Sequence, residues 1–103
     1  MVDFEKIPYA VVKGLLPYMT LAAVKKIGKG TVYNILAYIE KEFNTHIPSA
    51  TMYGVIYSLE RKGYIQIVEG KNYGLTEKGF MLLKKAGEVI NGFSPKIEAL
   101  LEN

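Results

Sequence analysis

Residues 47–79 read IPSATMYGVIYSLERKGYIQIVEGKNYGLTEKG, and the order of patterns in this stretch decides the fold. Residues 49–62 begin with a serine that can cap a helix, and Gly63 after them suits a helix stop. Residues 64–75 hold two runs rich in β-formers around a Glu-Gly-Lys-Asn turn. Thr76 can then cap a new helix. The stretch therefore predicts a helix, a narrow hairpin and a second helix in succession.

The helix predicted over residues 49–62 has two faces of different character. One face is apolar and consists of Met52, Val55, Ile56 and Leu59. The other is small or polar and consists of Thr51, Gly54, Tyr57, Ser58 and Arg61, with Tyr53 at its border. A helix that enters the major groove of DNA needs this division, because one face packs on the preceding helix while the other offers donors to phosphates and base edges.

The residues before this helix predict three further helices. An apolar helix is expected over residues 4–14. The residue before Pro17 is driven away from helical angles and Pro17 suits a first helical position. A second helix is therefore expected over residues 17–27, with Gly28 as its stop. Thr31 is a good N-cap for a third helix over residues 32–43, whose apolar residues recur with helical spacing. This third helix, a polar turn and the two-faced helix form a helix-turn-helix.

The chain after the hairpin predicts two more helices. The helix capped by Thr76 is expected to end near Ile90, because Asn91-Gly92 suits a helix end. Ser94-Pro95 then resembles the cap and first position of a last short helix. The predicted fold is mainly α with a small β-hairpin, a winged helix-turn-helix followed by a C-terminal helical segment.

Size and composition narrow the class of protein. The 103 residues provide room for one domain with one modest core. The absence of cysteine excludes disulfides, thiolate zinc sites and thiol nucleophiles. No apolar run reaches the roughly 18 residues of a membrane span, and the acidic start is unlike a signal peptide, so we expect a soluble cytoplasmic protein. The net charge of +3 permits nucleic-acid binding without establishing it.

The residues form no catalytic or metal-binding pattern. The single histidine, His46, lies in a polar turn without a second ligand nearby in sequence. Gly28-Lys29-Gly30-Thr31 lacks the spacing of a phosphate-binding loop, and no serine elbow is present. We therefore expect neither an enzyme nor a bound metal or cofactor.

We expect the hairpin of residues 64–75 to act as a wing beside the recognition helix. Its tip offers Lys71 and Asn72, which suit a phosphate or the minor groove. Lys29 lies near a helix junction, where it can touch flanking backbone. The predicted contacts to double-stranded DNA are Lys29, Thr31, Ser49, Thr51, Tyr53, Gly54, Tyr57, Ser58, Arg61, Lys62, Lys71, Asn72 and Tyr73.

Three segments resemble the PadR-like family of transcriptional regulators. Residues 48–65, PSATMYGVIYSLERKGYI, are similar to the family's recognition helix and first wing strand. Residues 73–79, YGLTEKG, resemble its wing exit, and residues 33–36, Tyr-Asn-Ile-Leu, resemble the start of its second helix. The resemblance spans about residues 19–85.

The resemblance implies a homodimeric repressor that binds a pseudo-palindromic operator. It makes residues 1–18 an N-terminal extension, residues 19–79 the DNA-binding domain and residues 80–103 a helical dimerisation segment. The implied dimer contacts are Phe80, Leu83, Gly87, Ile90, Ile97, Leu100 and Leu101.

Two alternatives stay open at the level of sequence. A winged helix can serve as a protein–protein interaction module in a transcription or other nucleic-acid assembly, and the mild net charge favours that role. Whichever function holds, a purely structural reading also stays open for single residues: Tyr53 and Tyr57 packing against a neighbouring helix, and Lys29 belonging to a solvated face. A small effector molecule at the dimer interface is compatible with the family, but no residue pattern identifies one.

Overall fold

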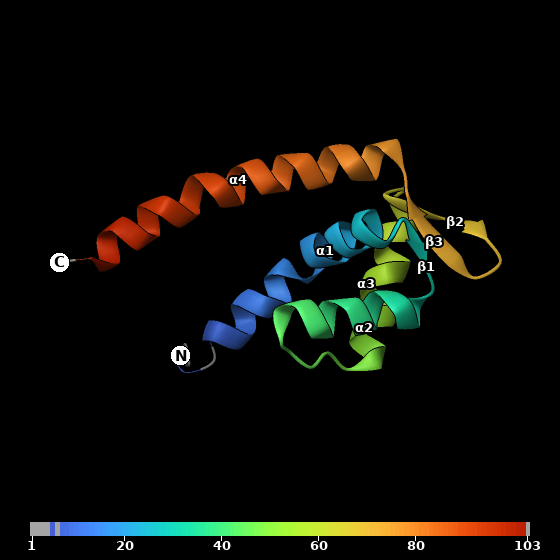
Figure 1. Cartoon of the computed structure of the whole chain (residues 1–103), viewed down its shortest axis with the longest axis horizontal. Coiled ribbons are helices and arrows are strands. Elements are labelled where there is room, and N and C mark those ends of the chain that lie inside the picture. The colour runs from blue at the N-terminus through green and yellow to red at the C-terminus, as the bar shows by residue number, and fades with distance from the viewer. Residues whose placement is uncertain (1–4, 6, 103) are drawn as a thin grey trace.

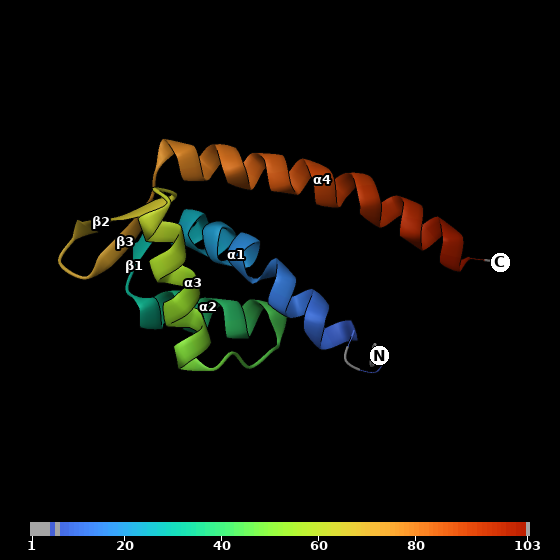
Figure 2. The same ribbon diagram turned by 180° about the vertical axis from the view of Figure 1, so that it is seen from behind.

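The computed structural model describes residue 5 and residues 7–102 as a mainly helical domain with a small sheet. The elements are α1 (Ile7–Ile27), β1 (Lys29–Gly30), α2 (Val32–Phe43), α3 (Ser49–Arg61), β2 (Ile65–Glu69), β3 (Asn72–Leu75) and α4 (Glu77–Leu101). Figure 1 shows α1, α2 and α3 gathered beside the sheet, while α4 runs back along α1. The C-terminal part of α4 projects beyond the other helices, on the side where α1 begins (Figures 1 and 2).

The three strands form one antiparallel sheet in the order β1-β3-β2. β2 and β3 make the predicted hairpin, and the winged helix-turn-helix architecture is confirmed. Gly74 of β3 is paired with Lys29 on one side and with Gln66 on the other. β1 lies in the short segment between the helices predicted over residues 17–27 and 32–43, where the sequence pattern does not indicate a strand. Its two residues pair with β3 because the end of α1 at Gly28 and the cap of α2 at Thr31 hold this short link beside the hairpin.

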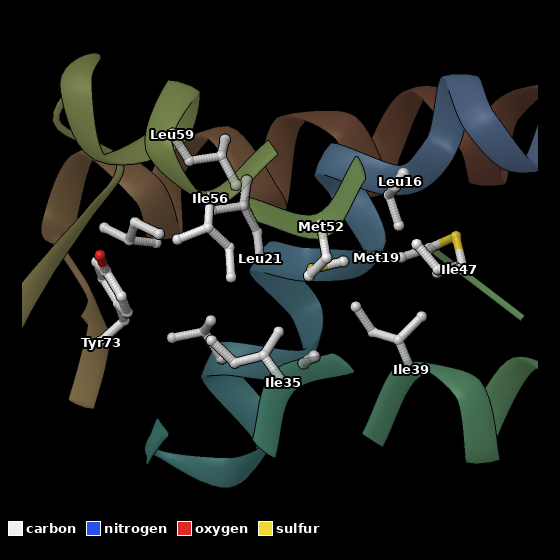
Figure 3. Close-up of a cluster of buried hydrophobic side chains, with 13 residues drawn as sticks. Leu16, Met19, Leu21, Ile35, Ile39, Ile47, Met52, Ile56, Leu59 and Tyr73 are labelled. Carbon is white, nitrogen blue, oxygen red and sulfur yellow. The ribbon is translucent and has the colours of Figure 1, made fainter. Parts of the chain in front are cut away.

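One hydrophobic core lies between α1, α2, α3 and the sheet (Figure 3). Its buried apolar members are Leu16, Met19, Leu21, Ala23, Val24, Ile35, Ile39, Ile47, Met52, Ile56, Leu59, Ile65 and Tyr73. The predicted packing face of α3 is confirmed, because three of its members belong to this core and Val55 packs against it half-buried. The core therefore determines which side of α3 faces outward.

Most predicted helix caps are confirmed. Thr31 and Asn34 form a capping box at the start of α2, in which each side-chain oxygen accepts the other's backbone N–H at 3.1 Å. Gly28 and Gly63 have φ values of 85° and 83°, the left-handed conformation that ends α1 and α3. Thr76 caps α4 through a bond from a first-turn N–H to its hydroxyl oxygen.

The predicted cap at Ser49 is wrong by one residue. Ser49 is the first residue of α3, and Pro48 occupies the N-cap without a side-chain bond. The carbonyl of Pro48 accepts the N–H of Met52 at 3.1 Å, which closes the first turn. The start of α3 is set by the residue before Pro48. Ile47 is buried in the core, and its N–H donates to the Glu40 carboxylate.

α1 is one continuous helix, and the predicted break before Pro17 is wrong. A proline inside a helix leaves the carbonyl four residues earlier, here that of Lys13, without its partner. Both residues are exposed, so solvent can satisfy that carbonyl. Leu16, the residue before the proline, is buried in the core. Its carbonyl accepts a hydrogen bond from the hydroxyl of the buried Thr20 at 2.8 Å. Packing on the core therefore keeps the helix continuous through the proline.

α4 is also one helix, so the predicted end at Asn91-Gly92 and the restart at Ser94-Pro95 are wrong. The whole region is exposed, and solvent can take up the carbonyl that loses its partner at Pro95. Apolar residues recur at intervals of three and four through it, at Ile90, Phe93, Ile97 and Leu100. A continuous helix gathers these residues on one side.

The division of the chain at residues 18/19 and 79/80 remains a prediction. Both boundaries fall inside helices, the first in α1 and the second in α4. Neither boundary is marked by a linker, because the same helix provides residues to both sides of it.

Candidate nucleic-acid interface

The turn of the helix-turn-helix is held by Glu40 of α2. Its Oε2 accepts the N–H of Ile47 at 2.9 Å and lies 3.0 Å from Nδ1 of His46. Asn44 ends α2 in the left-handed conformation, with φ of 47°. Buried Ile47 then anchors the segment that leads into α3. These contacts set the direction in which α3 leaves the turn, and sequence reasoning gave Glu40 no such role.

The outer face of α3 borders two separate hollows, one toward α1 and α4 and the other toward the wing. Thr51, Ser58 and Lys62 line a groove of about 510 Å³ together with Pro17 of α1 and Leu82 of α4. This side of α3 therefore faces the two long helices and not the wing. The wing-facing side carries the two tyrosines of α3 instead.

A second hollow, which we call the tyrosine hollow, lies between α3 and the wing and has a volume of about 380 Å³. It is lined by Thr31, Val32, Tyr33, Tyr53, Tyr57, Ile67, Lys71 and Tyr73. The rings of Tyr53 and Tyr57 are 5.8 Å apart and inclined at 48°. Tyr33 is 76% exposed and was not predicted as a contact. The available sequence signal was its position two residues after the Thr31 cap, at a helix N-terminus.

Tyr73 belongs to the core beneath the tyrosine hollow. It is only 6% exposed, and its hydroxyl donates to Oε1 of Glu60 at 3.3 Å. Burial raises the pKa of the Tyr73 phenol above its usual value, and the neighbouring Glu60 carboxylate raises it further. The phenol therefore stays protonated at neutral pH and keeps α3 joined to the sheet. Tyr73 therefore has a structural role, and it is not among the side chains that we propose to contact DNA.

The predicted polar and basic contacts near the wing differ in their availability. Lys71 at the wing tip and Arg61 in the last turn of α3 are exposed. Lys29 pairs with Glu69, with 2.6 Å between Nζ and Oε2, so its charge is partly neutralised. The Thr31 hydroxyl already caps α2. Arg61 and Lys71 are thus the more available cations beside this face.

The other predicted contacts lie at the two ends of α3, at its centre and at the start of β3. Ser49 is exposed at the start of α3, and Lys62 is exposed just after its end. Asn72 is half-buried at the start of β3. Gly54 is exposed at mid-helix on the edge of the groove toward α1 and α4, and a Cβ built on it would meet no other atom within 4 Å.

The predicted dimer residues fall into two groups along α4. Phe80, Leu83, Gly87 and Ile90 lie on the half that runs along α1. Within this group Leu83 packs against the core, and Ile90 lines an apolar groove of about 360 Å³ between α1 and α4. Ile97, Leu100 and Leu101 lie on the projecting half and are 53%, 82% and 78% exposed. Phe93 adds a further side chain to the exposed group, at 63%.

The described part of the chain contains neither a membrane-spanning helix nor a cluster of metal ligands. No helix there has both the length and the hydropathy needed to cross a membrane. Across residue 5 and residues 7–102, no three His, Asp or Glu side chains gather closely enough to hold a metal ion.

Comparison with known proteins identifies the fold. No family model and no curated protein matches the sequence. The structure is similar to a transcriptional regulator from Clostridium thermocellum, with a TM-score of 0.81 and 22% identity over 90% of this chain and 96% of that one. It is also similar to a PadR-like transcriptional regulator from Bacillus cereus, with a TM-score of 0.84 and 18% identity over 91% of this chain and 98% of that one. The chain therefore has the fold of the PadR-like regulators, which confirms the architecture predicted from residues 47–79.

Proposed function

We propose that this chain is a cytoplasmic transcriptional regulator that binds double-stranded DNA through α3 and the wing. The observation that carries the proposal is the tyrosine hollow, where Tyr53 and Tyr57 of α3 meet Lys71 of the wing beside the N-terminus of α2. Hydroxyl donors, a cation and a helix N-terminus are the groups that bind DNA phosphates. The shared fold with two transcriptional regulators supports the same role.

In this proposal α3 enters the major groove with its first residues nearest the base edges. Ser49, Tyr53, Gly54 and Tyr57 are exposed along α3 and face the bases or the groove walls. Arg61 at the far end of α3 meets a phosphate. The wing follows the flanking backbone, where Lys71 neutralises another phosphate.

We further propose that the chain acts as a homodimer and represses transcription. The projecting half of α4 exposes Phe93, Ile97 and Leu100, and a grouped apolar surface of this kind marks a protein contact. A second copy related by twofold symmetry would cover it, and the same symmetry would present two α3 helices. Such a dimer fits a pseudo-palindromic operator whose half-sites lie about one helical turn apart. Occupancy of that operator would block a promoter.

The docking is tested by Arg61→Ala and Lys71→Ala. Each variant is expected to bind DNA more weakly, because each removes one phosphate contact. The negative slope of log affinity against log salt is expected to become shallower by about 1. The fold is expected to be unchanged, since both side chains are exposed. The measurement is gel shift with random duplex DNA at several salt concentrations. Lys41→Ala, in the last turn of α2, is the matched control.

Two outcomes would contradict the proposal in different ways. If both variants bind as tightly as the parent, the assigned docking surface is wrong. If the parent shows no binding even at low salt, the winged helix serves instead as a protein-interaction module. The Lys29–Glu69 pair favours that second function, because it reduces the charge available for DNA.

Gly54→Ala is expected to change stability and DNA affinity in opposite directions. The added methyl group meets no other atom of the protein, so the helix gains roughly 0.5–1 kcal/mol of intrinsic stability and Tm rises. The same methyl group projects from the exposed face of α3, where it would crowd the DNA and lower affinity about tenfold. Thermal unfolding and gel shift on the same sample check both effects. Unchanged binding would show that this face does not approach DNA closely.

A further inference from the structure

The exposed positions of α3 carry an unusual selection of side chains. From the first residue onward they are Ser49, Ala50, Tyr53, Gly54, Tyr57 and Arg61. Arg61 is the only charged residue among them, and it lies in the last turn of α3. Neither asparagine nor glutamine occurs anywhere in α3, which the structure describes in full.

This selection excludes the side-chain pairings that usually identify purines from a recognition helix. Guanine is read by arginine or lysine bound to its O6 and N7, and adenine is read by asparagine or glutamine bound to its N6 and N7. The early exposed positions of α3 offer none of these groups. They offer hydroxyls, which bind several bases, and apolar surface from the Ala50 methyl group and two tyrosine rings. The one major-groove feature that apolar surface recognises is the C5-methyl group of thymine.

The shape of α3 favours the same contact. Ala50, Gly54 and Tyr57 all lie on the side of α3 away from Met52 and Ile56, which are fully buried. Since Gly54 has no side chain and the space beyond it is open, base edges can come close to the helix there. Ala50 and Gly54 follow Tyr57 around this side of the helix, so no long side chain keeps a thymine methyl group from the Tyr57 ring or from the Ala50 methyl group.

We infer that α3 identifies its operator through the C5-methyl groups of thymines, contacted by Ala50 and by the rings of Tyr53 and Tyr57. The inference rests on the proposed function, because it concerns how the same surface chooses among DNA sequences. Phosphate contacts by Arg61 and Lys71 then provide affinity without sequence preference. Each half-site contains one or more thymines under the first two turns of α3.

The test begins with selection of bound duplexes from a random DNA pool by the full chain. In the recovered duplex, thymines within the half-sites are replaced one at a time by uracil, which lacks only the C5-methyl group. Affinity is expected to fall about fourfold for each contacted methyl group, the effect of exposing one buried carbon. Uracil outside the half-sites is the control and is expected to leave affinity unchanged.

Variants identify which side chain makes each contact. Ala50→Gly and Tyr53→Ser remove the apolar groups at exposed positions, so the fold is expected to persist and circular dichroism checks it. At the thymine that each group contacts, the variant is expected to bind the thymine and uracil duplexes equally. The parent would still distinguish them.

Three results would overturn the inference. If uracil within the half-sites leaves the affinity of the protein for the duplex unchanged, the thymine methyl groups are not contacted. An equal loss from uracil outside the half-sites would show that DNA deformability, and not methyl contact, sets the preference. Recovery of no DNA at all would overturn this inference and the proposed function together, whereas the first two results leave DNA binding itself intact.

Discussion

Gly79→Ala is expected to destabilise the domain by about 3 kcal/mol or more, at the upper end of the cost of overpacking a core. Gly79 lies in the first turn of α4, directly against the start of the wing. A Cβ at this position would be 2.0 Å from the carbonyl oxygen of Tyr64 and 2.9 Å from Cδ1 of Leu75. The closer atom is backbone, so no side-chain rotation relieves the overlap.

The Tyr64 carbonyl cannot move away without breaking other contacts. It accepts both the backbone N–H of Thr76 at 3.1 Å and the Thr76 hydroxyl at 3.0 Å. These bonds join the two ends of the hairpin to the start of α4. The methyl group would therefore separate the wing from α4, and DNA binding is expected to weaken along with stability.

Thermal and urea unfolding followed by circular dichroism measure this effect, and Tm is expected to fall by roughly 10 °C or more. The matched control is Gly92→Ala in the same helix, where an added Cβ meets no atom within 4 Å. That variant is expected to be neutral or more stable, because alanine is the better helix former. A Tm for Gly79→Ala within 2 °C or so of the parent would contradict the described packing of α4 against Tyr64.

Phe93→Glu is expected to convert the proposed homodimer into a monomer. Phe93 is 63% exposed on the projecting half of α4, among the apolar residues that a second copy would cover. Placing a carboxylate there would require its burial without a partner, which weakens association by about 3 kcal/mol, or roughly a hundredfold in Kd. The single domain is expected to stay folded, since the side chain contributes little to its own core.

Sedimentation equilibrium measures the molecular mass in solution and so distinguishes the dimer from the monomer. The control is Asn91→Glu, which adds the same side chain at an exposed position nearly opposite Phe93 around α4. Asn91→Glu is expected to remain dimeric and to bind the operator as the parent does. Phe93→Glu is expected to lose operator affinity as well, because the two α3 helices would no longer be linked. A dimer that persists in Phe93→Glu would place the interface elsewhere, and a monomeric parent would overturn the homodimer itself.

Local signals explain why much of the fold was predictable from sequence. The Thr31 and Thr76 caps, the Gly63 stop and the apolar spacing of residues 52–59 act within one or two turns of chain. The structure confirms each of them. The packing face of α3 was predicted for the same reason, because helical periodicity alone decides which residues share a side.

The helix breaks at Pro17 and Pro95 were predicted by equally local rules and are wrong. The cost of a proline depends on whether solvent can satisfy the carbonyl it leaves unpaired, and on what the rest of the helix buries. Neither quantity is readable from neighbouring residues. Strand β1 was missed for a related reason, since two residues become a strand only when β3 lies beside them.

The candidate site likewise has some features that local sequence predicts and others that depend on the tertiary structure. Residue types and spacing by themselves determined a helix-turn-helix with a wing, and they identified the tyrosines of α3 and the lysine at the wing tip as available groups. Only the tertiary structure decided that Thr51 and Ser58 face α1 and α4, that Lys29 pairs with Glu69, and that Tyr73 is buried against Glu60. The physical reason is range: caps and helical periodicity act between residues close in the chain, whereas burial and ion pairing depend on segments brought together only when the core forms.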